Sequence, residues 1–274
     1  MLVCALGDLT LDVVVRLAGP IAERADTDAT IAVGAGGQAA NVAAWAAGLG
    51  ATARFVGKTG ADDSGELVRR ELARRGVDAV GPIAGRNGTI CSLVSPGGER
   101  SMLADRGVAP ELAPDELDPA WFSGCRHLYI SGYALFREPA RRAAGRAVEL
   151  ARAERATVSV DLSSWSGIRA AGVDRFVAAV SELAPDVVFA NEDEERVVGG
   201  PLPEVVWILK RGPRGCSFAG TERAALPVED VVDTTGAGDA LAAGWIVGGA
   251  DLALEAAARC VQGLGGMPPL GSEP

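Results

Sequence analysis

The sequence has very little of what a zinc site, a histidine-based catalytic triad or a disulfide-rich fold requires. It contains a single histidine, His127, and its 5 cysteines lie far apart with no CxxC pair. These shortages argue against the common zinc-binding patterns and against a histidine-based triad. We therefore expect the cysteines to be small buried residues of a protein that works in a reducing compartment.

Positive charge is also in short supply, with 26 basic residues against 36 acidic ones and a formal net charge of −10. Such a surface repels phosphate backbones and anionic lipids, so neither nucleic acid nor a membrane is an expected partner. The first residues do not resemble a signal peptide, and we expect a cytoplasmic protein. The uncharged stretch 31–53 is long enough to span a bilayer. Its glycines, Gln38 and Asn41 favour a buried helix with its entry loop instead.

Short apolar runs alternate with amphipathic segments along most of the chain. The runs are rich in valine, isoleucine and leucine and predict buried strands at 2–6, 53–56, 127–130, 157–160, 187–190 and 205–209. The segments 64–75 and 138–154 repeat apolar residues at helical spacing. This alternation predicts an α/β protein in which helices flank a mostly parallel sheet.

Two regions break the alternation. The segment 10–17 follows the first strand without a helix, and the runs 89–95 and 99–104 flank Pro96-Gly97-Gly98, a hairpin signal. These extra strands, inserted at about 10–36 and 86–106, predict a small sheet that projects as a lid. No linker divides the chain, so 1–274 is expected to be a single domain.

The most informative motif is Asp-Thr-Thr-Gly-Ala-Gly-Asp at 233–239, which follows an apolar pair and precedes a helical segment. Glycines at a helix start allow backbone N–H groups to turn toward an anion, and the helix dipole favours negative charge there. Asp239 beside such an anion site could accept the proton of a hydroxyl that attacks a phosphate. The alternative is a plain helix start in which Asp239 only balances the dipole.

A second glycine motif, Gly-Ala-Gly-Gly-Gln-Ala-Ala-Asn at 34–41, matches the G-x-G-x-x-A dinucleotide fingerprint. An oxidoreductase would also need an acid at the end of the next strand, where the chain has Arg54 and Lys58. Gly57-Lys58-Thr59 resembles part of a phosphate-binding P-loop, but Thr52 stands where that motif needs glycine.

Polar residues at two places in the chain are candidate site residues because of their location at or in predicted strands. Asn191 and Glu194 follow a predicted strand, at the carboxyl edge where α/β sheets place their sites. The alternative is that this acidic helix start compensates the helix dipole. Asp12 lies in an otherwise apolar strand and could hold a sugar diol, or it could be a polar position on an edge strand.

Together these segments resemble the ribokinase-like, PfkB-type carbohydrate kinases. They are a Gly-Asp strand end with Asp12 beyond it, GGQAAN at 36–41, NEDE at 191–194 and DTTGAGD at 233–239. The resemblance covers nearly the whole chain, and the pair of glycine motifs is highly specific. It implies a ribokinase-like three-layer α/β sandwich whose β-sheet lid closes over the sugar. It also implies a kinase that uses ATP and Mg²⁺.

The resemblance further implies a role for each motif. Asp239 would be the general base, and the backbone amides of Gly236, Ala237 and Gly238 would stabilise the transferring phosphoryl group. The substrate would be bound by Asp12, Gly36, Gly37, Asn41 and Arg106, the last of which stands where some sugar-acid kinases bind a carboxylate.

The same resemblance places nucleotide and cations. Asn191 and Glu194 would hold Mg²⁺, largely through water. The nucleotide would contact Asn191, Lys210, Gly212, Gly215 and Thr235. Asp233 and Thr235 match a site for a monovalent cation, K⁺, that some members have.

Substrate choice stays open at this point. A neutral ketose or pentose is expected, with 2-keto-3-deoxygluconate as a sugar-acid alternative, because Trp165 stands where sugar-acid kinases carry a second arginine. A nucleoside is a further alternative, since Trp165 offers a stacking surface. So is a catalytically weak sugar- or nucleotide-binding regulator, because the segment between Glu194 and Lys210 is short. The family also implies a homodimer through the lid, with 10–17 as the exposed strand.

Overall fold

The computed structural model describes residues 1–96 and 100–270, and within them a nine-stranded sheet forms the centre of the molecule. Its order is β13-β12-β11-β10-β9-β8-β1-β4-β5. The strands β5 to β11 of this order are parallel, and β12 and β13 add an antiparallel edge. In chain order the strands are β1 (Leu2–Leu6), β4 (Thr52–Val56), β5 (Val77–Val80), β8 (Cys125–Ser131), β9 (Thr157–Asp161), β10 (Val187–Asn191), β11 (Val206–Lys210), β12 (Cys216–Phe218) and β13 (Thr221–Arg223).

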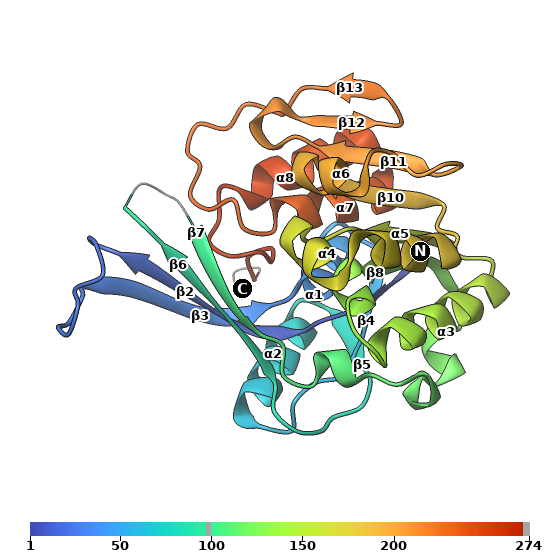
Figure 1. Ribbon diagram of the computed structural model, residues 1–274, viewed down its shortest axis with the longest axis horizontal. Helices are drawn as coiled ribbons and strands as arrows, with labels where there is room; N and C mark the ends of the chain where they lie inside the picture. The colour runs from blue at the N-terminus through green and yellow to red at the C-terminus, as the bar shows by residue number, and fades with distance from the viewer. Residues whose placement is uncertain (97–99, 271–274) are drawn as a thin grey trace.

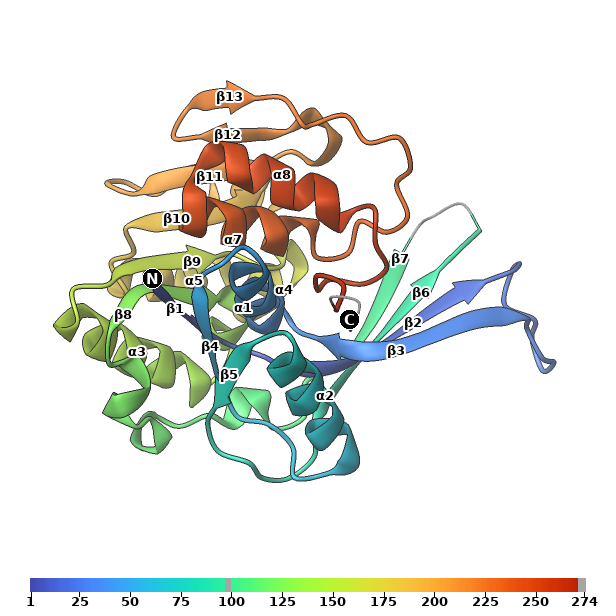
Figure 2. The ribbon, with the colours of Figure 1, turned by 180° about the vertical axis from the view of Figure 1, so that it is seen from behind.

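Helices cover both faces of this sheet, which makes three layers (Figures 1 and 2). One face carries α1 (Gln38–Gly48), α2 (Asp63–Arg74), α7 (Ala237–Gly248) and α8 (Ala250–Cys260). The other carries α3 (Ala140–Ala153), α4 (Trp165–Ala171), α5 (Val173–Glu182) and α6 (Glu192–Val198). Short 3₁₀ turns lie at Ala109–Glu111, Pro114–Glu116, Pro119–Phe122, Gly132–Leu135 and Gly212–Arg214. Alternate residues of β1 point into opposite cores: Val3 and Ala5 belong to the core on the α1 side, and Cys4 and Leu6 to the core on the α3 side.

A second sheet, the lid, extends away from this body (Figure 1). Its order is β3-β2-β6-β7, formed by β2 (Thr10–Leu17), β3 (Ala29–Gly36), β6 (Gly88–Val94) and β7 (Arg100–Asp105). The root of the lid is fixed to α2, where Glu71 Oε2 accepts the Ala35 amide at 3.0 Å.

The predicted parallel strands and both helices are confirmed to within two residues of their ends. Two local expectations are wrong. The segment 10–17 is not an exposed edge, because β2 is hydrogen-bonded to β3 on one side and β6 on the other. The entry to α1 is not a loop, because residues 29–36 pair with β2 as strand β3. The hairpin turn predicted at Pro96-Gly97-Gly98 lies, apart from Pro96, outside the described residues.

The cysteines are free, and all but Cys91 are buried. His127 is buried beside the Ser159 hydroxyl at 2.8 Å, and burial lowers its pKa to about 4, so it is a core residue. No helix in the described part of the chain has the length and apolar character to cross a membrane.

Candidate active site

The glycine motif at 233–239 opens helix α7. Gly236 has a φ of 75°, and a Cβ there would lie 2.4 Å from the Gly266 Cα, so the position requires glycine. The first helical hydrogen bond runs from the Ala240 amide to the Gly236 carbonyl at 2.8 Å. The preceding amides, including those of Gly238 and Asp239, therefore have no acceptor within the helix. This arrangement gives α7 an N-terminus suited to an anion.

Asp239 lies in the first turn of α7 and meets helix α1. Asn41 Nδ2 donates to Asp239 Oδ2 at 2.7 Å, a contact between residues 198 positions apart. The Asp239 pKa is raised to about 7, chiefly by burial and also by the charge of Asp161, against the lowering effects of the Asn41 hydrogen bond and of Lys210. A carboxyl group with this pKa is poised to exchange a proton near neutrality, as a general base does. Asn41 Oδ1 is buried and has no partner among the described residues.

The lid contributes a second carboxylate next to a glycine. A Cβ on Gly36 would lie 2.0 Å from the Asp12 carboxyl carbon, so only glycine leaves room for Asp12 there. The Thr10 hydroxyl donates to Asp12 Oδ1 at 2.8 Å, and burial raises the Asp12 pKa to about 6. Gly37 has a φ of 99° and touches the Asp8 carbonyl, where a Cβ would be 2.3 Å from the oxygen. The lid root and the start of α1 thus form one tightly fitted corner.

Arg106 is held at this corner by Asp8, the acid of the Gly-Asp strand end, and by Tyr133, which the sequence did not single out. Its Nη1 donates to Asp8 Oδ2, and its guanidinium lies over the Tyr133 ring, 3.6 Å from the centroid. Burial raises the pKa of Asp8, and the Arg106 charge opposes that rise. Nearby, Gln38 Oε1 accepts the hydroxyls of Ser131 and Ser163 at 2.5 Å each. A polar residue directly after a strand was the available signal for Asp8, and it holds for Asp161 too.

Asn191 and Glu194 form the reciprocal cap that starts α6. Glu194 Oε2 accepts the Asn191 amide at 2.8 Å, and Asn191 Oδ1 accepts the Glu194 amide at 2.9 Å. Glu194 is 2% exposed. Burial raises its pKa to about 7, Lys210 opposes the rise and Asp161 adds to it. The segment is an acidic helix start, as the dipole alternative expects, yet compensation of a helix dipole does not need so deeply buried a carboxylate.

A cavity of about 770 Å³ lies between β11 and the helices α7 and α8. One end is polar, with Asn191, Lys210 and Gly238, and the rest is apolar, with Leu226, Val228, Leu241 and Leu254 among its lining. Gly212 and Gly215 line it with φ values of 55° and 99°. Thr235 does not line this cavity, whereas its neighbour Thr234 does. Cavities of this size and polarity suit small cofactors and nucleotides.

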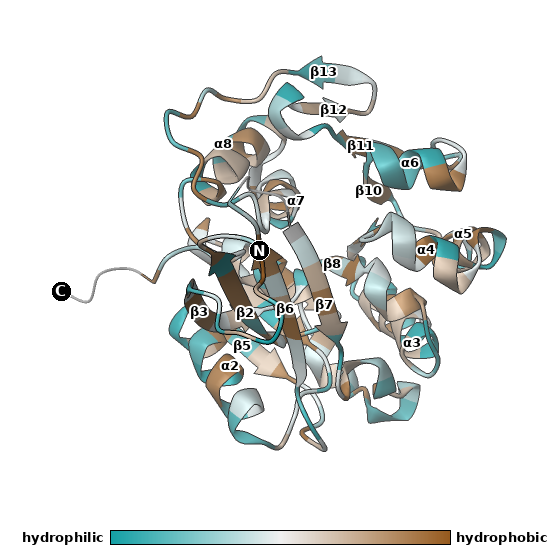
Figure 3. Ribbon diagram, turned by 60° about the vertical axis from the view of Figure 1, so that its left-hand side comes forward, coloured by the Kyte–Doolittle hydropathy of each residue, from teal (hydrophilic) through white to brown (hydrophobic). Residues whose placement is uncertain are grey.

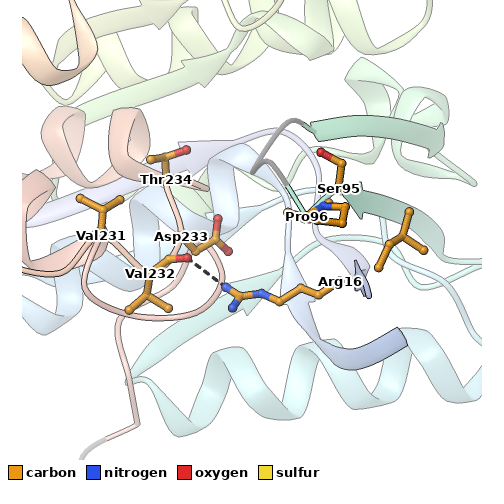
Figure 4. Close-up of a pocket in the computed structure, with 9 residues that line it drawn as sticks. Arg16, Ser95, Pro96, Val231, Val232, Asp233 and Thr234 are labelled. Atoms are coloured by element: carbon orange, nitrogen blue, oxygen red, sulfur yellow. Dashed lines mark hydrogen bonds between the residues drawn. The ribbon is translucent and has the colours of Figure 1, made fainter. Parts of the chain in front are cut away.

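A second cavity of about 400 Å³ lies between the lid and the loop that precedes α7 (Figure 4). Arg16 of β2 crosses it and donates from Nη2 to the Val232 carbonyl at 3.0 Å. Asp233 Oδ1 accepts the Thr235 amide at 2.9 Å and hydroxyl at 2.7 Å, and its Oδ2 accepts the Gly265 amide at 3.0 Å. Asp233 therefore shapes the loop that leads to the anion site. Among the described residues, no three His, Cys, Asp or Glu side chains are grouped to hold a metal ion by themselves.

The structure thus brings a buried carboxyl group, a helix N-terminus suited to an anion and a large, partly polar cavity to one edge of a parallel sheet, an arrangement that suits an α/β phosphotransferase. The family model described as pfkB family carbohydrate kinase matches residues 1–267, and the chain belongs to this family of carbohydrate kinases. The dinucleotide interpretation of 34–41 is wrong, because Gly36 ends an antiparallel lid strand rather than a strand of the parallel sheet.

Similar proteins support the same class. An ATP-dependent ribose-1-phosphate kinase from Halopiger xanaduensis is 35% identical over 244 residues, 82% of this chain and 78% of that protein. A 5-dehydro-2-deoxygluconokinase from Shouchella clausii is 32% identical over 78% of this chain and 73% of its own. Among solved structures, adenosine kinase from Sinorhizobium meliloti superposes with a TM-score of 0.86 at 24% identity, over 97% of this chain and 95% of that one. At 24% identity, this structural similarity shows that the two chains share a fold.

Proposed function

We propose that this carbohydrate kinase transfers the γ-phosphoryl group of ATP to a hydroxyl of a small sugar, with Asp239 as general base. The observation that carries the proposal is the position of Asp239. Its carboxyl group, with a pKa of about 7, lies in the first turn of α7 and accepts a hydrogen bond from Asn41. The preceding residue, Gly238, lines the cavity of about 770 Å³. In this reaction the sugar hydroxyl gives its proton to Asp239, its oxygen bonds to the γ-phosphorus, and the bond to the ADP oxygen breaks.

The amides at the start of α7 would receive the charge that develops on the transferring group. Gly236, Ala237 and Gly238 would supply these N–H groups with no side chain larger than the Ala237 methyl group. Lid closure over Asp12, Gly36 and Gly37 would exclude water from the reacting hydroxyl.

The use of ATP and Mg²⁺ is supported by a similar chain from E. coli that was solved with both, at a TM-score of 0.81 and 23% identity over 97% of this chain and 94% of that one. Asn191 and Glu194 would hold Mg²⁺ through its water, since the buried Glu194 carboxylate needs a positive partner to stay ionised. The ion would neutralise charge on the nucleotide phosphates. Asp233 and Thr235 would form part of a K⁺ site beside the anion loop.

For the substrate, the two curated relatives carry names that denote a sugar phosphate and a sugar acid. Arg106 is the guanidinium at the lid root, and its Nη1 is bonded to Asp8, which leaves Nε and Nη2 to face an anionic substituent. We therefore rank anionic sugars first and the neutral ketoses and pentoses expected from the sequence second. Trp165, 43% exposed at the start of α4, keeps nucleosides as a candidate class.

The test is ADP release from Mg·ATP across ribose 1-phosphate, 2-keto-3-deoxygluconate, fructose, ribose and adenosine. Substrate-dependent release that disappears in Asp239→Asn supports the proposal and identifies the substrate class. Calorimetric binding of sugar or nucleotide without turnover would instead favour the binding regulator.

The lid also offers a surface for a homodimer. Val33 pairs with Val13 in register, and Ile31 with Val15, so all four apolar side chains share one face, with Ile31 and Val33 exposed at 61% and 55%. Figure 3 shows the brown colour of hydrophobic residues on β2 and β3. We propose that a second copy covers this face. In sedimentation velocity, Val33→Lys should yield monomers, while Met102→Lys on the opposite face should not.

A further inference from the structure

The chain segment that follows α8 folds back to the candidate active site. Its Gly266 lies against Gly236, because a Cβ on Gly236 would be 2.4 Å from the Gly266 Cα. The same residue meets Asn41, because a Cβ on Gly266 would be 2.5 Å from Asn41 Nδ2. Gly266 therefore touches both the glycine that starts α7 and the side chain that is hydrogen-bonded to Asp239.

The place of Gly266 is decided by its backbone, since glycine has no side chain to pack. The residues around it are tied to neighbouring elements by two hydrogen bonds. The Gly265 amide donates to Asp233 Oδ2 at 3.0 Å, and Arg75 Nε donates to the Pro268 carbonyl at 3.1 Å. A third bond, made to the Gly266 carbonyl, completes the attachment of this segment.

Trp45 of α1 makes this third bond. Its indole Nε1 donates to the Gly266 carbonyl at 2.9 Å, in a buried contact between residues 221 positions apart. Trp45 stands four positions after Asn41, so both side chains lie on one face of α1. That face presents Asn41 to the Asp239 carboxylate, and it presents Trp45 to the peptide that touches Asn41.

The identity of this side chain is not explained by apolar packing alone. Trp45 is 1% exposed, and the other buried residues of α1, apart from Asn41 and Val42, are alanines. A phenylalanine would also fill an apolar site with an aromatic ring, but it would leave the Gly266 carbonyl without its donor. A buried carbonyl without a donor is destabilised, so the peptide would turn toward another partner.

Resting on the proposed function, we propose that Trp45 is a positioning residue for phosphoryl transfer, acting through Gly266. The bond from Trp45 fixes the Gly266 peptide, and this peptide limits the positions open to Asn41 and Gly236. Asn41 in turn orients the Asp239 carboxylate, and Gly236 starts the turn whose amides would receive the phosphoryl charge. One indole N–H thus keeps the base and the anion site in register.

The base lies among several charged groups, and an uncharged indole adds nothing to them. Burial raises the Asp239 pKa most, Asp161 and Asp12 raise it as well, and the Asn41 hydrogen bond and Lys210 lower it. Loss of the indole N–H can therefore act on the base only through position. If Asn41 moves away, the carboxylate loses a donor that favours its ionised form, and its pKa rises.

The experiment compares Trp45→Phe with Trp245→Phe. Trp45→Phe removes the indole N–H but keeps an aromatic ring for the Arg259 guanidinium, which lies 5.7 Å from the indole centroid. Trp245→Phe is the matched control, because Trp245 packs edge-on against Phe189 and its N–H has no acceptor among the described residues. Thermal melting establishes that both variants are folded.

A second variant tests the same contact from its other side. Gly266→Ala keeps the bond from Trp45 but places a methyl group 2.5 Å from Asn41 Nδ2, so Asn41 must move. Gly263→Ala is its control, because a Cβ there meets the Cys260 carbonyl at an ordinary 3.7 Å. Since both changes act through one peptide, the loss in the double variant should be smaller than the product of the single losses.

We expect kcat to fall about 10- to 100-fold in Trp45→Phe and in Gly266→Ala, the scale of a small misplacement of reacting groups. The acidic limb of kcat/KM should move upward by about half a pH unit or more, because Asp239 loses part of its hydrogen bond. In Trp45→Phe, backbone amides in 233–241 and 263–268 should exchange hydrogen faster. Both control variants should match the wild type.

A folded Trp45→Phe whose kcat and acidic limb match the wild type would overturn the proposal. Equal losses in Trp45→Phe and Trp245→Phe would overturn it as well, since they would show only a disturbed core. If Trp45→Phe does not fold, Gly266→Ala decides, and an unmoved acidic limb in that variant refutes the role of the contact.

Failure of the proposed function is recognised separately, by turnover that persists in Asp239→Asn or is absent from the wild type. Hydrogen exchange needs no turnover. Unchanged exchange in Trp45→Phe would then overturn the role of Trp45, and faster exchange in both segments would support it.

Discussion

Replacing Asp239 by Asn should strongly lower turnover and, above neutral pH, stabilise the protein. Loss of a general base lowers rates by about 100- to 10,000-fold. The stability gain follows from burial, which raises the pKa of Asp239 from 3.8 to about 7. The folded protein therefore holds a proton that the unfolded chain has already lost, and the stability that this proton provides disappears as pH rises through 7. An asparagine cannot ionise, so it escapes this loss.

The size of the effect can be worked out. A shift of about three pKa units corresponds to a ceiling of about 4 kcal/mol. Water reaches part of this residue, so we expect about 2 kcal/mol, or a rise in Tm of roughly 4–8 °C at pH 8. The new amide can also donate to Asn41 Oδ1, the buried acceptor that has no partner among the described residues.

The assay is thermal melting of both proteins from pH 4 to pH 8. The difference in Tm should be near zero at pH 4 and largest at pH 8. Asp251→Asn is the control, because Asp251 is also in the first turn of a helix but is exposed. The difference in Tm between Asp251→Asn and the wild type should not grow with pH. If Asp239→Asn gained nothing at pH 8, or gained most at pH 4, the assignment of a buried, proton-holding base would be refuted.

Three further predictions test the site. Asn41→Ala removes the hydrogen bond to the base and should move the acidic limb of kcat/KM about one pH unit upward; an unmoved limb would mean that this bond does not tune the base. Gly36→Ala places a methyl group where the Asp12 carboxylate lies and should raise the KM for the sugar about tenfold or more. Gly145→Ala, at a position of α3 where a methyl group meets no neighbour, should leave KM unchanged. Equal KM values for the two variants would contradict the packing of Gly36 on Asp12. Arg106→Gln leaves Asp8 without its partner and should weaken anionic sugars more than neutral ones in competition assays; equal losses would argue against anion binding.

Six strands of the nine-stranded sheet were predictable because local pattern and tertiary environment agree there, whereas the short strands β5, β12 and β13 were not predicted. The run 187–190 is apolar at every position, and a strand buried on both faces needs just that. The helix at 138–154 was predictable for the complementary reason, since α3 buries a stripe of alanines and exposes arginines to water.

The lid was harder to predict, because the sequence of a single strand does not show which other strands pair with it. The segment 10–17 was expected at an edge, yet β3 and β6 pair with it from 29–36 and 88–94. The sequence placed lid strands within about 10–36 but did not delimit the strand at 29–36, because its alanines and glycines have weak strand preference, and pairing with β2 overrides that preference.

The site divides in the same way. By itself, the sequence determined the local features of the site. These are the glycines at the helix start at 236–238, the carboxylate of Asp239 that follows them, and the polar residues at strand ends. Only the tertiary structure decided what these groups do to one another. Asn41 reaches Asp239 because α1 packs on α7, and Lys210 reaches Asp161 because β9 and β11 flank β10. The physical reason is that proton affinity and charge depend on burial and on partners a few ångströms away, which chain folding alone brings together.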